Sequence, residues 1–222
     1  MTAGVVIPTR FNPPTLKPLL RVLDDDGVRV VLLHSETFGH ELYRMWNYGV
    51  HRLRDAGIYD IAIFNDDIVI APGTVGVMSE ALRTADPNVV LVGPEHGDRK
   101  KPAIPNRIRL AVEPKRNFGY AFMFKGELAL PEFDEAYHIH QSDIIWENQL
   151  RELGYDLATI RGLTMRHLRS YSVNRVADDG PTQEDHERMR KIKAWPPVEP
   201  PAKGRRYTLD LQKRLAQERS QR

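Results

Sequence analysis

Short apolar segments and longer amphipathic segments alternate along the first part of the chain. The apolar segments predict buried strands, because parallel strands covered on both faces are apolar throughout. They are residues 4–8, 28–33, 58–64 and 89–92. The amphipathic segments repeat apolar residues three and four positions apart, which predicts helices at residues 15–23, 42–56 and 72–84. Strands that alternate with helices predict an α/β fold with a mainly parallel sheet.

The residues that follow the predicted strands are the first candidates for a binding site. An open parallel sheet binds its ligands beyond the carboxyl ends of its strands. Those ends are followed by Thr9 and Arg10, by residues 34–36, and by residues 65–67. We therefore expect functional side chains in these three segments.

Cysteine is absent from the 222 residues. Its absence excludes disulfides, thiolate metal sites and a cysteine nucleophile. The length suits one α/β domain followed by a tail. No stretch approaches the ~20 apolar residues that a membrane-spanning helix needs. The first residues lack the pattern of a signal peptide, so we expect a cytoplasmic protein without a transmembrane segment.

The charge is unevenly distributed along the chain. The net charge of +2 combines two basic segments of +5 each, residues 96–116 and 201–222, with a remainder of −8. Such segments bind nucleic acid, a phosphorylated polymer or a lipid phosphate, or they are simply solvated, and both interpretations stay open. Four prolines within residues 196–201 predict an extended spacer before the second segment. This tail is a candidate for contact with DNA, a membrane surface or another subunit.

Two adjacent carboxylates, Asp66 and Asp67, come directly after the predicted strand at residues 58–64, and apolar residues resume after them. Ionised groups beside an apolar core are costly unless other groups compensate them. A hard divalent cation such as magnesium or manganese takes such oxygen ligands. The alternative is an Asx-type turn with solvated carboxylates.

Several blocks of the sequence resemble, in order, the motifs of the family-two glycosyltransferases. The match covers residues 4 to about 172. The blocks are Val5 to Arg10, Asn47-Tyr48-Gly49, Phe64 to Asp67 as a DXD-type motif, Gly119 to Lys125, Phe133-Asp134-Glu135, Ser142-Asp143, Gly154-Tyr155 and His167. The resemblance implies the GT-A fold, with a Rossmann-like sheet flanked by helices and a small acceptor subdomain. Compact members of this kind occur in bacteria and phages.

The resemblance also implies a division of the chain. Residues 1–172 would form the GT-A domain, with a nucleotide-binding half at 1–93 and an acceptor half at 94–172. Residues 173–222 would form the proline-rich linker and the basic tail.

The activity implied is metal-dependent transfer of a sugar from a nucleoside-diphosphate sugar to an acceptor hydroxyl, with inversion. The candidate acceptors are macromolecules such as modified DNA, a protein or a glycan. Asp67 occupies the metal-facing position of the DXD-type motif, and with His167 it would hold Mn2+ or Mg2+ against the leaving diphosphate. His167 as a structural, hydrogen-bonded residue is the alternative. The residues that would bind the nucleotide sugar are Pro8, Thr9, Arg10, Glu36, Asn47, Asn65 and Asp66.

Asp143 matches the family's general base, which takes the proton of the acceptor hydroxyl. The glutamate that precedes this base in many members is Ser142 here, so the sequence predicts a single carboxylate. A helix N-cap is the structural alternative for Asp143, and the two roles are compatible. His138 and His140 are assigned to the acceptor side or to a structural role.

Two departures from the family pattern concern the nucleotide pocket. Glu36 supplies the only carboxylate after the second strand, displaced from its usual position. Trp46 stands where an arginine often precedes the helix asparagine, and Arg44 is the candidate substitute. A catalytically silent module that binds nucleic acid or an anionic glycan through the basic segments is therefore the alternative function. A nucleotidyltransferase is disfavoured, because no glycine-rich loop follows the first strand.

Overall fold

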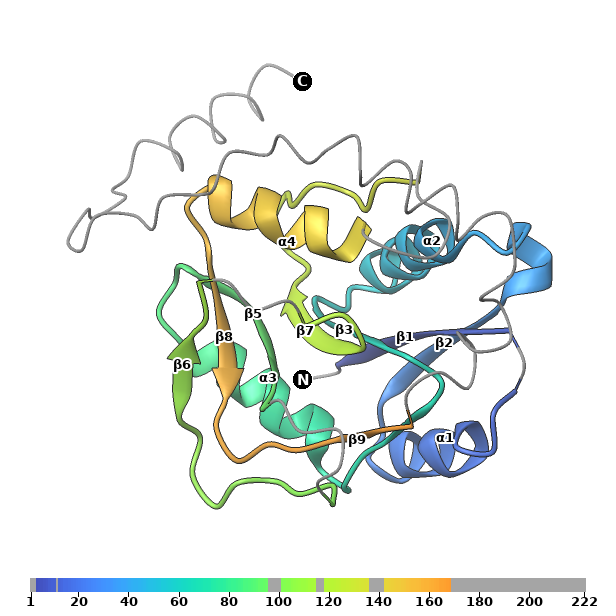
Figure 1. Cartoon of the computed structure of the whole chain (residues 1–222), viewed down its shortest axis with the longest axis horizontal. Helices are drawn as coiled ribbons and strands as arrows, with labels where there is room; N and C mark the ends of the chain where they lie inside the picture. Colours follow the sequence, from blue (N-terminus) through green and yellow to red (C-terminus); the bar gives the residue numbers. More distant parts are fainter. Residues whose placement is uncertain (1–2, 11, 96–100, 115–117, 136–141, 169–222) are drawn as a thin grey trace.

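The computed structural model describes residues 3–10, 12–95, 101–114, 118–135 and 142–168 (Figure 1). Its strands are β1 (Gly4–Thr9), β2 (Arg29–His34), β3 (Asp60–Phe64), β4 (Ile68–Val69), β5 (Val89–Pro94), β6 (Leu110–Val112), β7 (Ala121–Lys125), β8 (Asp156–Ile160) and β9 (Arg166–His167). Its helices are α1 (Leu16–Asp25), α2 (Leu42–Asp55), α3 (Thr74–Thr84) and α4 (Ser142–Glu152), with a 3-10 turn η1 (Ser35–Phe38). The predicted tail and His138 and His140 lie outside the described residues.

Seven strands form one mixed sheet in the order β2-β1-β3-β7-β5-β8-β6. Strands β1, β2 and β3 run parallel to one another, and β5 runs parallel to β8. Strand β7 lies between β3 and β5 and is antiparallel to both. Strands β1, β2, β3, β5 and β8 therefore all run in one direction. Strand β6 is antiparallel at the edge. A separate two-stranded antiparallel ladder joins β4 to β9.

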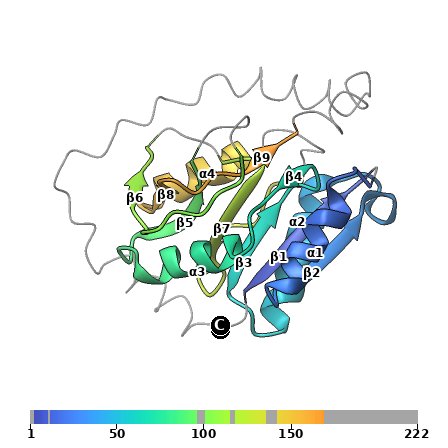
Figure 2. The same cartoon turned by 90° about the horizontal axis from the view of Figure 1, so that it is seen from below.

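Helices cover both faces of the sheet, which gives three layers (Figures 1 and 2). Helices α2 and α4 pack on one face and helices α1 and α3 on the other. Alternation along β3 shows why: Ile61 and Ile63 belong to the core under α2 and α4, while Ala62 and Phe64 belong to the core over α1 and α3. The prediction of an α/β fold with helices flanking a mainly parallel sheet is confirmed.

Aromatic side chains fill the core between α2, α4 and the sheet. The ring centroid of Phe133 lies 4.9 Å from that of Trp46 and 4.5 Å from that of Trp146. Phe122 and Phe124 of β7 pack on the Trp146 ring at 5.8 and 5.3 Å. Core packing is therefore the role of both β7 phenylalanines, and it fixes α2, α4 and the loop that carries Phe133 relative to one another.

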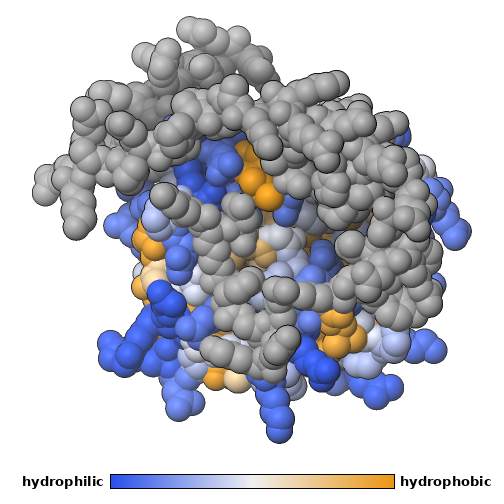
Figure 3. All heavy atoms as spheres, in the orientation of Figure 1, coloured by the Kyte–Doolittle hydropathy of each residue, from blue (hydrophilic) through white to orange (hydrophobic). Residues whose placement is uncertain are grey.

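The surface visible in Figure 3 carries hydrophobic areas that are small and separated by hydrophilic residues. No described helix is long and apolar enough to cross a membrane. Strands β6, β7 and β8 come from residues 94–172 and lie in the same sheet as the strands of residues 1–93. The boundary at residue 93 therefore does not separate two sheets, and the proposed division into halves stays a prediction.

Candidate active site

The carboxyl ends of β1, β2 and β3 meet at one edge of the sheet. Thr9 pairs in register with His34 of β2, and Val6 pairs with Ile63, one residue before the end of β3. The segments predicted to carry function are therefore neighbours in space. Antiparallel β7 begins at the same edge, and the backbone N–H of Asn65 donates to the carbonyl oxygen of Tyr120, 2.9 Å away.

Asp66 points into the protein. Its side chain is buried, and the Thr9 hydroxyl donates to its Oδ2 at 2.6 Å. The Thr15 hydroxyl donates to the carbonyl oxygen of Asp66 at 2.9 Å. Burial raises the pKa of Asp66 to about 6, the Thr9 hydrogen bond opposes that rise, and the neighbouring charge of Asp67 adds to it. Asp66 therefore ties the turn after β3 to β1 and to the start of α1.

Asp67 meets His167. The two-residue strand β9 pairs with β4, and the Leu168 N–H donates to the carbonyl oxygen of Asp67 at 2.9 Å. This pairing brings Nε2 of His167 to 3.0 Å from Oδ1 of Asp67. The Tyr120 ring stacks on the imidazole with centroids 4.7 Å apart. Two residues one hundred positions apart in the sequence, both predicted as metal ligands, therefore lie in contact.

The donor set of this pair suits a hard divalent cation. A carboxylate oxygen and an imidazole nitrogen are ligands that manganese accepts. The observed separation of 3.0 Å is that of a direct ion pair or hydrogen bond between the two side chains, so a cation would have to replace this contact. No cluster of three metal-ligating side chains occurs among the described residues. Oxygens of a bound diphosphate and water would have to complete the coordination.

Asp143 lies in the first turn of α4, inside the helix and not at the N-cap position that was its structural alternative. The Tyr43 hydroxyl of α2 donates to its Oδ1 at 3.2 Å. Helix amides at this position favour a negatively charged side chain. The turn before β7 passes close to the carboxylate, because a Cβ at Gly119 would lie 3.2 Å from Oδ2 of Asp143. Gly119 also has φ +46, so this backbone conformation and the close approach both favour glycine.

A second carboxyl group, Glu147, lies one turn after Asp143 on α4 and was not predicted. Its side chain is fully buried, and its Oε1 accepts the Phe118 N–H at 2.9 Å. Burial raises the pKa of Glu147 to about 8, with the Phe118 hydrogen bond opposing the rise. Its Oε2 lies 3.6 Å from the Arg151 guanidinium, one further turn along. Asp143 therefore has a second carboxyl group near it, one turn later on the helix and buried, and not at the preceding position that Ser142 occupies.

The sequence signal for Glu147 was its spacing. Asp143, Glu147 and Arg151 stand four residues apart, so they share one face of α4. Trp146 and Leu150 show that the neighbouring positions face the core. Recognising a buried carboxyl required knowing that the 118–120 turn covers this face, which is tertiary information.

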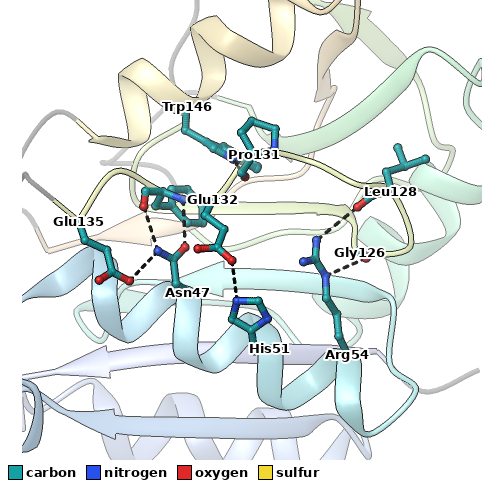
Figure 4. A network of polar contacts seen from close by, with 10 residues as sticks. Asn47, His51, Arg54, Gly126, Leu128, Pro131, Glu132, Glu135 and Trp146 are labelled. Atoms are coloured by element: carbon teal, nitrogen blue, oxygen red, sulfur yellow. Dashed lines mark hydrogen bonds and ion pairs between the residues drawn. The ribbon is translucent and has the colours of Figure 1, made fainter. Parts of the chain in front are cut away.

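Asn47 joins α2 to the segment before α4 (Figure 4). Its amide nitrogen donates to the carbonyl oxygen of Phe133 and to Oε1 of Glu135, each at 2.9 Å. Its amide oxygen accepts the Phe133 N–H at 3.0 Å. Both amide hydrogens are thus engaged. Direct contact of Asn47 with a nucleotide stays a prediction and would require exchange of these bonds.

Further polar contacts along α2 hold the same segment (Figure 4). His51 Nε2 lies 2.8 Å from Oε1 of Glu132, and Nε of Arg54 donates to the carbonyl oxygen of Gly126 at 2.9 Å. The Trp146 indole N–H donates to the Pro131 carbonyl oxygen at 2.6 Å. The segment that leads to Asp143 is therefore anchored on both α2 and α4.

The remaining predicted nucleotide-binding residues lie around the same edge. Pro8 is buried in β1, and the Arg10 backbone N–H donates to the Asp66 carboxylate. Glu36 is exposed on η1, directly after β2. Arg44, the candidate substitute for the family arginine, lies 3.3 Å from Glu41, the N-cap residue of α2.

The described part of the first basic segment, residues 101–114, lies beside β8 and beside the connection from β8 to β9. Ala103 bridges Thr164, and the Arg161 N–H donates to the Arg109 carbonyl oxygen at 2.8 Å. The Arg161 guanidinium lies 3.6 Å from each of Glu95 and Glu113. These ion pairs neutralise Arg161, which lies outside the basic segment.

Comparison with known proteins supports the fold. No family model matches the chain, and no curated protein matches it. Protein A197 from STIV superposes with a TM-score of 0.51 at 13% identity, over 75% of this chain and 85% of that one. Residues 1–349 of TarS from S. aureus superpose with a TM-score of 0.52 at 10% identity, over 74% of this chain and 59% of that one. At such identities the likeness concerns the fold alone, and the α/β fold shared with these structures agrees with the GT-A-type fold expected from the sequence.

Proposed function

We propose that the protein is a metal-dependent, inverting glycosyltransferase. It moves a sugar from a nucleoside-diphosphate sugar to the hydroxyl group of an acceptor. The observation that carries the proposal is the contact of Asp67 with His167 at 3.0 Å, at the carboxyl edge of a GT-A-type sheet. The same edge bears Asp143, whose position next to Gly119 links it to the turn that packs on His167.

Asp67 and His167 are the residues that would hold Mn2+ or Mg2+. A divalent cation there would neutralise the charge that develops on the nucleoside diphosphate as it leaves. Tyr120 holds the imidazole plane by stacking, and the β4–β9 pairing holds both ligands at a fixed separation. The nucleotide sugar would lie across the carboxyl ends of β1, β2 and β3 and against Asn47 of α2. Its other contacts would be Pro8, Thr9, Arg10, Glu36, Asn65 and Asp66.

Asp143 would be the general base. The acceptor oxygen attacks the anomeric carbon from the face opposite the diphosphate, and its proton passes to the Asp143 carboxylate as the bond to the diphosphate breaks. Attack from the opposite face inverts the anomeric configuration. The Tyr43 hydroxyl, at 3.2 Å from Oδ1, orients the carboxylate for this transfer.

Turnover of nucleotide sugars tests the proposal. Wild-type protein is incubated with a panel of UDP-, GDP-, ADP- and TDP-sugars, with and without manganese, and release of the nucleoside diphosphate is measured. We expect metal-dependent release that falls by about 100-fold or more in Asp143→Asn and also falls in Asp67→Ala. Asp24→Asn, an exposed aspartate on α1, is the matched control and should behave as wild type.

Equal release of the nucleoside diphosphate in all variants would refute this mechanism. Release that is unchanged by manganese or by a chelator would refute it as well. Absence of turnover together with salt-dependent binding of DNA or an anionic glycan, unchanged in Asp67→Ala, would support the catalytically silent binding module instead. The donor sugar, its base and the acceptor follow from the substrates that turn over.

A further inference from the structure

Glu147 is a buried carboxyl group to which the proposed mechanism gives no role. It is fully buried on α4, between Asp143 one turn before it and Arg151 one turn after it. A buried carboxyl group is costly unless hydrogen bonds compensate it. Its Oε1 accepts the Phe118 N–H at 2.9 Å, and the Gly119 N–H also donates to the carboxyl group. The Glu147 side chain of α4 thus accepts hydrogen bonds from two successive backbone amides in the turn before β7.

That turn connects the two ends of the candidate site. On one side, Gly119 packs against Asp143, where even a Cβ would come within 3.2 Å of Oδ2. On the other side, the Tyr120 ring stacks on His167, and the Tyr120 carbonyl oxygen accepts the Asn65 N–H. His167 in turn contacts Asp67 at 3.0 Å. A continuous series of contacts therefore runs from α4 through Glu147 and residues 118–120 to the Asp67–His167 pair.

We propose that Glu147 is a positioning residue that fixes the 118–120 turn and so sets the Asp67–His167 pair relative to Asp143. The proposal rests on the proposed glycosyl transfer, since it assigns Glu147 a task in that site. Glu147 acts through the turn and does not touch the reacting atoms. Loss of its acceptor oxygen leaves the buried Phe118 N–H without its partner. The turn then relaxes, and Tyr120 moves off the imidazole.

Two substitutions separate the hydrogen bond from the packing. Glu147→Gln keeps an acceptor oxygen at the same position, whereas Glu147→Leu removes it at similar volume. The same exchanges at Glu152, which is exposed on the same helix, are the matched controls.

The first measurement does not need activity. The stacked Tyr120 ring shifts the side-chain NMR resonances of His167, which His167→Gln identifies. We expect Glu147→Leu to move these resonances, and Glu147→Gln and both Glu152 variants to leave them in place. An unmoved His167 signal in folded Glu147→Leu would overturn the proposal.

If Glu147→Leu does not fold, the rate of amide hydrogen exchange in the wild type tests the proposal instead. The Phe118 amide should exchange slowly, because its hydrogen bond goes to a buried side chain. Exchange as fast as that of an exposed loop amide would overturn the proposal as well.

The second measurement is turnover under the conditions that test the proposed function. A displacement near 1 Å costs about 100-fold in rate, so we expect a fall of roughly that size in kcat for Glu147→Leu, with KM for the donor little changed. Glu147→Gln should retain most of the wild-type kcat. An equal loss in both variants would overturn the assignment of the effect to the hydrogen bond with the Phe118 amide. A wild type without turnover refutes the glycosyl transfer but leaves the NMR result valid for the placement of the turn.

Discussion

Asp66 and Asp67 are neighbours in sequence and have opposite surroundings in the structure. Asp66 turns inward to the Thr9 hydroxyl, and Asp67 turns to His167 on β9. Both side chains are buried, and both residues lie in the turn between β3 and β4. The partner of each carboxylate, Thr9 for Asp66 and His167 for Asp67, depends on which other elements pack against this turn.

Thr9 should contribute to stability through its hydrogen bond to Asp66. Thr9→Val removes the hydroxyl while keeping the shape of the side chain, so the buried carboxyl loses its 2.6 Å partner. Leaving a buried polar group unsatisfied costs about 1–3 kcal/mol, and we expect that loss in the free energy of unfolding by urea. Thr9→Ser keeps the hydroxyl and should lose less. Equal stability of Thr9→Val and wild type would contradict the assignment.

Glu147 should make stability depend on pH. Its pKa is about 8 in the folded protein, against 4.5 as its ordinary value. Between these values the folded protein keeps a proton that the unfolded chain has lost, so stability falls as pH rises. The slope attributable to this group reaches about 1.4 kcal/mol per pH unit.

Urea unfolding from pH 5 to pH 8 measures this slope. Glu147→Gln does not titrate, so its stability should fall less steeply with pH than that of the wild type. Asp66 is present in both proteins and cancels in the difference. Parallel slopes would show that Glu147 is already ionised in the folded state.

At the scale of elements, the close approach of α2 to β1 depends on Gly49. A Cβ at Gly49 would collide with the side chain of Val6 in β1, whereas a Cβ at Gly76 of α3 would meet nothing within 4 Å. Both glycines lie inside helices, so the same substitution tests packing in one case and helix propensity in the other.

Alanine at the two positions should have opposite effects. We expect Gly49→Ala to lower the free energy of unfolding by about 1–3 kcal/mol, because the well-packed core must shift. Gly76→Ala should raise it by roughly 0.5–1 kcal/mol, because alanine favours the helix. Chemical denaturation of both variants beside the wild type measures the effects. A stabilising Gly49→Ala would mean that α2 does not pack closely on β1.

The two-residue strands β4 and β9 could not be predicted from the sequence pattern. The apolar segments and helical periodicities of residues 4–92 predicted β1, β2, β3 and β5 and the helices α1, α2 and α3, since each pattern repeats within one element. The pairing of β4 with β9 involves two residues on each side. Such a pairing leaves no periodic signal, and only the resemblance drew attention to His167.

At the scale of the whole molecule, the proposed site should couple nucleotide and metal binding to stability. A ligand present at 100 times its dissociation constant stabilises the folded state by about 2.7 kcal/mol, which corresponds to a rise in Tm of roughly 5 °C or more for a protein of this size. We expect a nucleoside diphosphate and manganese together to raise Tm by more than either alone.

A thermal-shift screen of UDP, GDP, ADP and TDP with and without manganese measures this coupling. In Asp67→Ala the added effect of the metal should disappear, while Asp24→Asn should keep it. An undiminished metal effect in Asp67→Ala would place the cation elsewhere in the protein.

Patterns within short segments were enough to predict the α/β class, the order of most elements and the carboxylates that follow the strands. The sequence also placed Asp143 at the start of a helix. The tertiary structure alone decided that β7 lies antiparallel between β3 and β5, that Asn47 holds the Phe133 segment, and that Glu147 is buried under the 118–120 turn. The physical reason is the same in each case: contacts between residues distant in sequence depend on how whole elements pack, and no local pattern encodes them.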